Sequence, residues 1–239
     1  MSLGLGLGAT LSSVSEDLSF RADPATHPKI KAFYKFKSLG GSDIGAVEAW
    51  LDQTGNFNLL QTDSNERPSY TASTGAVNFG ANANDSLESS TSMALASKFI
   101  IGIRMSIDAT INNDVAIGSN KEQGNFIRIK TNSRIGIRYG GSGLSEFDLD
   151  TTISDATTFN LIVARNSSGL SKVFINGTEQ SNTKTEGTPS SFIVDAIGVR
   201  KTDSNDLDGT IFEIQVYDGI DFNESGFISS LNSHLSNLS

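Results

Sequence analysis

Apolar and polar residues alternate along many short segments of the chain, and turns rich in glycine, asparagine and serine separate these segments. Between Lys98 and Ile107, for example, every second residue from Phe99 onward is large and apolar. Alternation with a period of two is typical of a β-strand that buries one face. The same pattern predicts strands at 114–119, 125–130, 134–139, 159–165, 172–180, 191–200 and 210–217.

Short turns join several of these segments into antiparallel hairpins. Residues 131–133 connect two predicted strands, and the sequence NSSGL at 166–170 connects two more. One helix is predicted near the C-terminus, from Asn223 as N-cap, because four apolar residues share one helical face: Phe227, Leu231, Leu235 and Leu238. The sequence therefore predicts an all-β fold, a two-sheet antiparallel jelly-roll sandwich with a short C-terminal helix.

The first twenty residues differ from the rest of the chain. Leu3, Leu5 and Leu7 alternate with glycine, so an extended chain carries leucines on one side and bare backbone on the other. Glycine loses the most conformational freedom when it is ordered, so such a segment needs a surface to hold it. We expect an extended N-terminal Gly/Leu arm and linker over residues 1–31, either anchored on a neighbour's sheet edge or packed on its own domain, and a sandwich over 32–239.

Composition narrows the classes of partner. The chain has 239 residues, no cysteine and a formal net charge of −9. The lack of cysteine excludes disulfides and thiolate metal sites. An acidic body repels phosphate backbones, so nucleic-acid binding is not expected. No apolar run is long enough to cross a bilayer, so membrane insertion is not expected either.

Three blocks of sequence then follow in an order that is typical of one family. The first joins AFYKFKSL at 32–39 to AVEAWLDQTGNFNLLQ at 46–61 and ERPSY at 66–70. The second is GAVNFG at 75–80, and the third is LDGTIFEIQVYDG at 207–219 with the helix after it. Together these blocks resemble concanavalin A-like, laminin G-like domains, particularly those of bacteriophage structural proteins.

The resemblance implies a non-catalytic virion protein that acts as a capsid decoration, tail or fibre component. The sandwich would bind host surface glycans or proteins, and the arm would join other virion proteins in a homo-oligomer or multicopy assembly. The resemblance implies no catalytic residue in this sequence. Two alternatives stay open, a carbohydrate-active enzyme (glycoside hydrolase) of the same fold and a secreted calcium-dependent lectin.

Signals for catalysis are weak. Glycoside hydrolases of this fold place carboxylates as E-x-D-x-x-E along one strand. The segment EIQVYD, which begins at Glu213, has Gln215 where the second carboxylate of that motif would be. Asp218 lies an odd number of residues further on, so it faces the other side of a strand. The two histidines, His27 and His234, lie near no nucleophile motif. We expect Glu213 to be a structural residue on the solvent face and the protein not to be an enzyme.

Candidate ligand-binding residues come from aromatic and acidic side chains. Tyr70, Tyr139 and Phe147 are candidate glycan contacts because exposed aromatic rings stack on sugars, and core packing is the ordinary alternative. The sequence DSNDLDG contains three candidate calcium ligands, Asp203, Asp206 and Asp208. The ordinary alternative is that this segment only forms a turn before a strand. We therefore expect no cofactor, with calcium in this loop as the open alternative.

Overall fold

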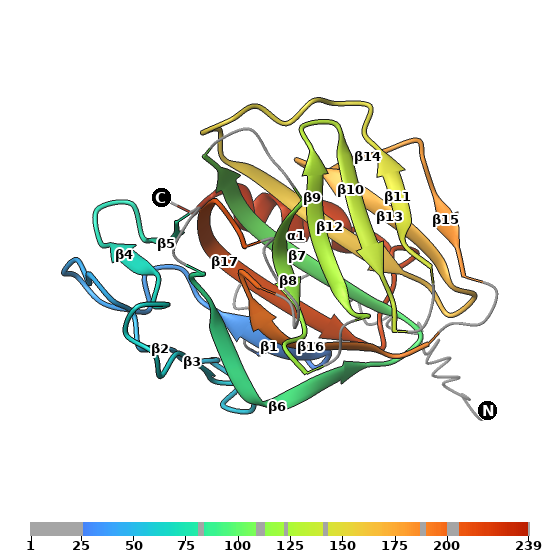
Figure 1. Ribbon diagram of the computed structural model, residues 1–239. Coiled ribbons are helices and arrows are strands. Elements are labelled where there is room, and N and C mark those ends of the chain that lie inside the picture. Colours follow the sequence, from blue (N-terminus) through green and yellow to red (C-terminus); the bar gives the residue numbers. More distant parts are fainter. Residues whose placement is uncertain are drawn as a thin grey trace, which may run out of the picture.

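The computed structural model describes residues 26–80, 84–108, 113–121, 124–140, 143–186, 190–199 and 206–238. Within these residues, two antiparallel β-sheets face each other, and one helix, α1 (Phe227–Ser236), packs on the outer side of one sheet (Figure 1). The all-β sandwich of jelly-roll type that the alternation predicted is confirmed.

The first sheet has nine strands in the described part of the chain, and its main order is β14-β13-β12-β7-β17-β5-β4. The long strand β17 (Gly209–Asp218) pairs along one side with β7 (Phe99–Ile107). Its other side is shared by β5 (Ala76–Phe79) and β1 (Ile30–Tyr34). The remaining strands of this sheet are β4 (Ser69–Thr71), β12 (Phe159–Arg165), β13 (Leu170–Ile175), β14 (Thr178–Glu179) and β15 (Lys184–Thr185).

The second sheet has eight strands among the residues described, in the order β11-β10-β9-β8-β16-β6-β3-β2. Its centre is formed by β8 (Asp114–Gly118), β16 (Phe192–Ile197) and the long β6 (Leu87–Leu95). The strands on either side of this centre are β9 (Phe126–Thr131), β10 (Arg134–Arg138), β11 (Ser145–Asp148), β3 (Leu59–Leu60) and β2 (Ala49–Trp50).

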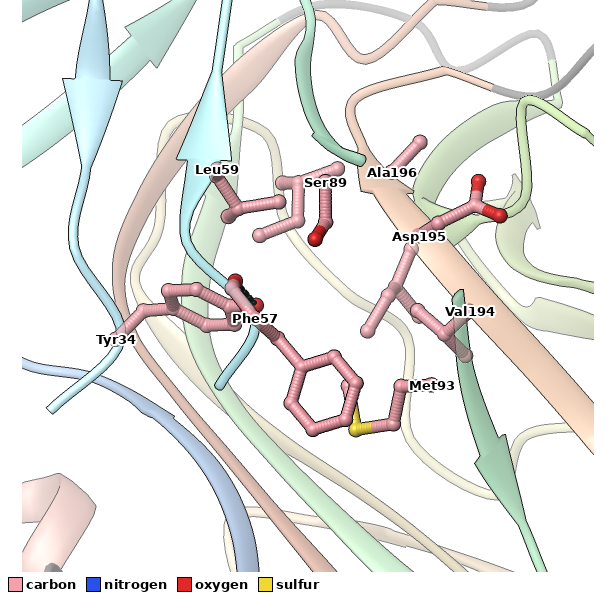
Figure 2. Close-up of a pocket in the computed structure, with 10 residues that line it drawn as sticks. Tyr34, Phe57, Leu59, Ser89, Met93, Val194, Asp195 and Ala196 are labelled. Atoms are coloured by element: carbon pink, nitrogen blue, oxygen red, sulfur yellow. Dashed lines mark hydrogen bonds between the residues drawn. The ribbon is translucent and has the colours of Figure 1, made fainter. Parts of the chain in front are cut away.

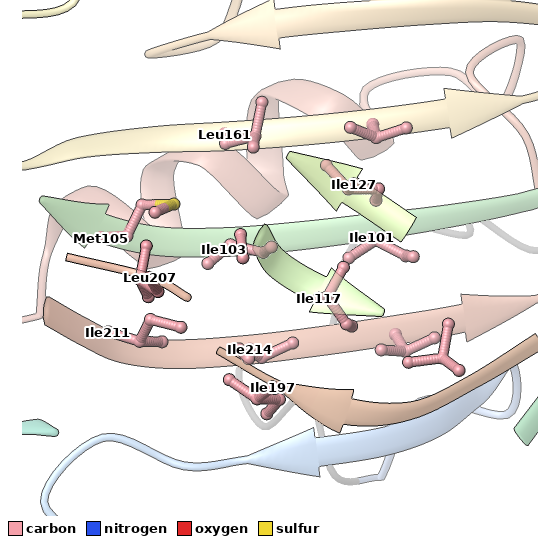
Figure 3. Packing of buried hydrophobic residues seen from close by; sticks show 14 of the residues in the cluster. Ile101, Ile103, Met105, Ile117, Ile127, Leu161, Ile197, Leu207, Ile211 and Ile214 are labelled. Atoms are coloured by element: carbon pink, nitrogen blue, oxygen red, sulfur yellow. The ribbon is translucent and has the colours of Figure 1, made fainter. Parts of the chain in front are cut away.

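The main core lies between the two sheets (Figure 3). Ile101, Ile103 and Met105 project from β7 toward residues of the opposite sheet such as Ile117 and Ile127, and all five are essentially inaccessible to water. Burying one such side chain contributes about 1.5–3 kcal/mol, so this interior is the dominant source of stability. The predicted alternation of β7 is thereby confirmed, since these side chains share its inner face.

The helix α1 buries the outer face of the first sheet. Its Phe227, Leu231 and Leu235 are buried in a second apolar cluster, which also contains Ile100 and Tyr217 from the sheet. The helix begins at Phe227 after Gly226, which has a φ of 71°, so the predicted N-cap at Asn223 is wrong. In the described residues, no helix has the length and apolarity needed to cross a membrane.

The family-like segment after Trp50 forms a compact loop around one carboxylate. Trp50 is buried, and Asp52 accepts backbone N–H bonds from Phe33 on β1 (2.8 Å), Thr54 (3.0 Å) and Phe57 (3.1 Å). Asp52 thus joins the loop to the first strand, which explains why an aspartate precedes the tight turn at this point.

The sandwich begins before the predicted boundary at residue 32. The strand β1 pairs with β17 from Ile30 onward. His27 is buried, and its ring centroid lies 5.4 Å from those of both Tyr217 and Phe227. The end of the predicted linker is therefore packed on the first sheet, while Leu3, Leu5 and Leu7 of the arm lie outside the described residues.

Candidate functional site

The aromatic residues predicted to contact glycans lie in the core. Tyr70, Tyr139 and Phe147 are at most 2% exposed, so their rings present no face for a sugar to stack on. The hydroxyl of Tyr70 donates to the Gly40 carbonyl at 3.0 Å, and that of Tyr139 bonds the Ser171 hydroxyl at 3.0 Å. The prediction of glycan contact at these three positions is therefore wrong, and the alternative of core packing describes them.

The predicted calcium loop is only partly described. Asp203 lies outside the described residues, whereas Asp206 and Asp208 lie just before β17. Burial and the nearby charge of Asp108 raise the pKa of Asp208. Within the described ranges, His, Asp and Glu side chains form no group of three or more that is placed to hold a metal ion.

Glu213 lies under α1 and not on a solvent face. Its Oε2 accepts the backbone N–H of Phe36 at 3.0 Å, and its Oε1 lies 2.7 Å from Nε2 of His234 on the helix. The side chain is 1% exposed. The expectation of a solvent-facing Glu213 is wrong because a helix covers this side of the sheet. Its contacts with Phe36 and His234 do fit the expected structural role.

A small pocket opens beside the second sheet, between residues of β3, β6, β8 and β16 (Figure 2). Its lining is mostly apolar and includes Leu59, Met93 and Val194. The space measures about 10 Å³, which is about enough for one water molecule and too little for a sugar ring. Figure 2 shows the carboxylate of Asp195 pointing away from this lining.

Asp195 is a buried carboxylate that collects three hydrogen bonds at an irregularity of β16. The pairing of β16 with β6 shifts register at this residue, as it does at a β-bulge. Oδ2 accepts the hydroxyls of Ser92 (2.7 Å) and Ser119 (3.1 Å), and Oδ1 accepts the backbone N–H of Asn120 (2.7 Å). With these donors the buried charge is satisfied, and Asp195 fixes the loop that follows β8.

Asn120 connects this buried carboxylate to a second one. Its side-chain Nδ2 donates to Oε1 of the half-buried Glu88 at 2.5 Å, so both carboxylates bind the same asparagine. Next to it, the ammonium of Lys121 donates to the backbone carbonyls of Ser89 (3.1 Å) and Ser90 (2.7 Å). We call the accessible members of this group the polar cluster: Glu88, Ser90, Thr91, Ser92, Asn120 and Lys121.

The polar cluster lies on the outer face of the second sheet. Glu88 is opposite Leu60 on β3 and opposite Ala196 on β16, and residues that oppose each other share a face of a sheet. Leu60 is 45% exposed, so an apolar surface borders the polar groups. A carboxylate, an amide, an ammonium and hydroxyls together offer donors and acceptors of the kind that bind sugar hydroxyls.

Sequence reasoning missed these residues because they are far apart in the chain. Glu88 and Asn120 are separated by 32 residues and Asn120 and Asp195 by 75. One signal was present, since the run Ser89–Ser92 between Leu87 and Met93 is unusually rich in hydroxyls for a strand. Such a run indicates an irregular strand with polar groups available for other contacts.

Neither a protein-family model nor a curated protein matches the sequence. Solved structures do match the fold. One is domain 4 of AbnA, a GH43 extracellular arabinanase from Geobacillus stearothermophilus, in complex with arabinotriose. It is 16% identical, and the match covers 87% of this chain and 98% of that one with a TM-score of 0.59.

A second match is Trypanosoma rangeli sialidase, which is 14% identical with a TM-score of 0.55. It covers 88% of this chain but 33% of the sialidase, so the chain spans about a third of that enzyme's length. The same sialidase in complex with sialic acid is 11% identical with a TM-score of 0.53, over 88% of this chain and 34% of that one. At these identities the likeness establishes the fold.

These likenesses correct two predictions. The matching folds belong to a glycoside hydrolase and a sialidase, which contradicts both the non-catalytic bacteriophage virion protein and the expectation that the protein is not an enzyme. The jelly-roll sandwich that the family resemblance implied is shown, whereas its bacteriophage and laminin G-like context is not supported.

Proposed function

We propose that the protein is a carbohydrate-active β-sandwich that binds an oligosaccharide at the polar cluster, as part of a glycoside-hydrolysing enzyme. The observation that carries this proposal is the arrangement in which Asn120 binds both Glu88 and Asp195. The arrangement holds an accessible carboxylate and amide in fixed positions, which lowers the entropic cost of binding a ligand.

Two features support a saccharide as the ligand. The polar cluster mixes donors and acceptors of both charges, which suits the many hydroxyls of a sugar. Leu60 lies directly beside Glu88 and gives an exposed apolar surface for the C–H face of a ring. The likeness to an arabinanase domain in complex with arabinotriose suggests the first ligand to test.

The geometry favours recognition as the contribution of these residues to hydrolysis. Most glycoside hydrolases use two carboxyl groups that both reach the scissile bond, about 5–10 Å apart. Glu88 is accessible, but Asp195 is 3% exposed and its two oxygens already accept three hydrogen bonds. Asp195 therefore acts as a positioning residue for Asn120, and Glu88 is the carboxylate that meets the ligand.

Isothermal titration calorimetry with arabinotriose and a panel of other neutral oligosaccharides tests the proposal. Glu88→Gln and Asn120→Ala should each weaken binding about tenfold, since each removes a hydrogen-bonding group that is held in place. Glu179→Gln is the matched control, because this glutamate is exposed on β14 of the other sheet. The proposal fails if no neutral saccharide binds or if the control weakens binding as much as the other two variants.

Release of reducing sugars by the same protein separates recognition from catalysis. Hydrolysis that disappears in Glu88→Gln while binding persists would make Glu88 a catalytic residue. Binding without hydrolysis would assign the polar cluster to holding substrate for a catalytic centre elsewhere.

A further inference from the structure

An exposed leucine lies directly beside the accessible carboxylate of the polar cluster. Leu60 on β3 and Glu88 on β6 are opposite each other in an antiparallel pair, so their Cβ atoms are about 4.5–5.5 Å apart. Both side chains point away from the core, because the residues before them, Leu59 and Leu87, are buried in it. A hydrogen-bond acceptor and an apolar surface are therefore neighbours on the outer face of the second sheet.

A second exposed leucine continues this apolar surface. Ala49 on β2 is opposite Leu60, and Leu51 follows Ala49 by two positions. Leu51 and Leu60 are 55% and 45% exposed. An apolar group that covers these side chains removes their surface from water, which favours binding.

The exposed apolar side chains at this place are aliphatic and not aromatic. In the described part of the chain, no phenylalanine, tyrosine or tryptophan is as exposed as Leu51 or Leu60. The face of a sugar ring stacks best on a flat aromatic ring. A branched aliphatic side chain packs instead around a small apolar group, so these leucines fit a methyl substituent better than a ring face.

Glu88 has one carboxylate oxygen available for a ligand. Its Oε1 accepts a hydrogen bond from Nδ2 of Asn120 at 2.5 Å, whereas Oε2 accepts none from the residues that the structure describes. Asn120 is itself held through its backbone N–H, which donates to Asp195 at 2.7 Å. Glu88 therefore presents an acceptor in a fixed position, and hydrogen bonds to a charged acceptor are the stronger ones.

An acetamido group combines the two features that match this pair of residues. The group is a planar trans amide, so its N–H and its methyl group lie on one edge and its carbonyl oxygen on the other. With the first edge toward the sheet, the N–H reaches Oε2 of Glu88 and the methyl group reaches Leu60. A sugar hydroxyl supplies a donor for Glu88 but no methyl group for Leu60.

Charge favours a neutral sugar as the carrier of the acetamido group. The chain has a formal net charge of −9. Around Asn120 lie two acidic side chains, Glu88 and Asp195, and one basic side chain, Lys121. A carboxylate on the sugar would meet more negative than positive charge here, which favours neutral amino sugars over sialic acids.

We infer that Glu88 and Leu60 bind the acetamido group of a neutral N-acetylated amino sugar. The inference rests on the proposed function and deepens it, because it names the class of sugar that the polar cluster takes. Ser90 and Thr91 are exposed on the same strand as Glu88, and their hydroxyls contact the remaining hydroxyls of the sugar.

Calorimetry with chitotriose and cellotriose tests the inference, because these neutral oligosaccharides differ only in carrying an acetamido group or a hydroxyl on each ring. Chitotriose should bind about tenfold more tightly, owing to the added methyl contact and the N–H bond to Glu88. Leu60→Ser should weaken chitotriose about fivefold and cellotriose less, so that the preference narrows. Leu60→Met keeps an apolar side chain and should retain the preference.

Leu144→Ser is the matched control. Leu144 is 37% exposed and lies just before β11, at the opposite end of the same sheet. The change should therefore leave both affinities as they are in the wild type. Thermal unfolding checks that each variant keeps the fold, which is expected because Leu60 and Leu144 are both exposed.

Three results would overturn the inference. One is chitotriose that binds no more tightly than cellotriose. Another is a preference that Leu60→Ser leaves intact or that Leu144→Ser removes as well. The third is sialyllactose that binds more tightly than chitotriose, which would assign the acetamido site to an acidic sugar.

The outcomes separate this inference from the proposed function. If arabinotriose or cellotriose binds and chitotriose binds no better, the proposed function stands and the acetamido site alone is wrong. If no neutral saccharide binds, chitotriose included, both are wrong.

Discussion

Arg165 donates a hydrogen bond from Nη1 to Oε2 of Glu186 over 2.6 Å, and their side chains are 0% and 8% exposed. The remaining nitrogens of the guanidinium donate to three backbone carbonyls, those of Ala96, Ser97 and Ser190. One buried arginine therefore joins β12 to three segments that lie far from it in the sequence. Its charge is balanced by Glu186 and each of its three nitrogens donates at least one hydrogen bond, which makes burial tolerable.

Replacing Arg165 should be among the most damaging single changes in the described structure. Arg165→Met leaves the Glu186 carboxylate buried without its cation and should lower the free energy of unfolding by about 3–5 kcal/mol. Urea denaturation measures this loss. Glu179→Gln breaks the exposed Lys172–Glu179 pair and should cost less than about 1 kcal/mol. Equal losses in the two variants would contradict this account of the buried pair.

The tyrosines should ionise only when the protein unfolds in alkali. Burial raises the pKa of all four, and that of Tyr139 reaches about 12 against about 10 in an unfolded chain. Their contribution to stability is complete below pH 10. It falls as pH rises toward 12, because the unfolded state loses protons first, by up to about 1.4 kcal/mol per pH unit for each tyrosine.

Spectrophotometric titration checks this prediction. Tyrosinate absorbance should rise together with the loss of near-ultraviolet circular dichroism. The pH dependence of unfolding should be shallower in Tyr139→Phe than in the wild type. A tyrosinate signal at pH 10 in a protein that is still folded would show that a tyrosine ring is accessible.

Gly209 should resist substitution at the start of β17. A Cβ at this position would lie 2.3 Å from the backbone oxygen of Ser106 on β7, and backbone atoms within a sheet cannot move apart easily. Gly209→Ala should therefore lower the free energy of unfolding by about 1–3 kcal/mol. Gly143→Ala is the control, since nothing lies within 4 Å of its Cβ position, and it should be close to neutral. Chemical denaturation of both variants measures the difference.

Replacing Asp195 should affect both stability and the proposed saccharide binding. Asp195→Ala removes the acceptor of Ser92, Ser119 and the Asn120 backbone N–H, and the loss of these bonds should cost about 2–3 kcal/mol. Because Asn120 then loses its fixed position, saccharide affinity should fall as well. Asp195→Asn retains one acceptor oxygen and should recover part of both losses. Full saccharide affinity in a folded Asp195→Ala protein would show that Asp195 does not position Asn120.

The sequence pattern determined the inside of the sandwich better than its outside. Alternation placed Ile135, Ile137 and Tyr139 on one face of a strand, and all three are buried in the main core. The same alternation assigned Tyr139 to the core. The prediction that Tyr139 contacts a glycan was therefore inconsistent with the pattern of its own strand. Glu213 could not be placed in this way, because only tertiary packing decides which sheet a helix covers.

The polar cluster could not be predicted because strand order brings its members together. β6 lies beside β16, and β16 beside β8, so segments around residues 88, 120 and 195 meet although long stretches of chain separate them. The register shift at Asp195 has no sequence motif of its own. Residues that share a face of one strand were easier to predict, since period-two alternation puts Arg128 with Lys130 and Arg134 with Arg138 on the outer face of the sheet.

The helix α1 makes the two outer faces of the sandwich different. The helix covers the outer side of the first sheet, and the polar cluster lies on the outer side of the second. Ser233 is exposed on the helix, and the chain has no cysteine, so Ser233→Cys would introduce a unique thiol. Coupling through that thiol would orient every molecule on a sensor surface or bead in the same way, with the outer face of the second sheet toward solution.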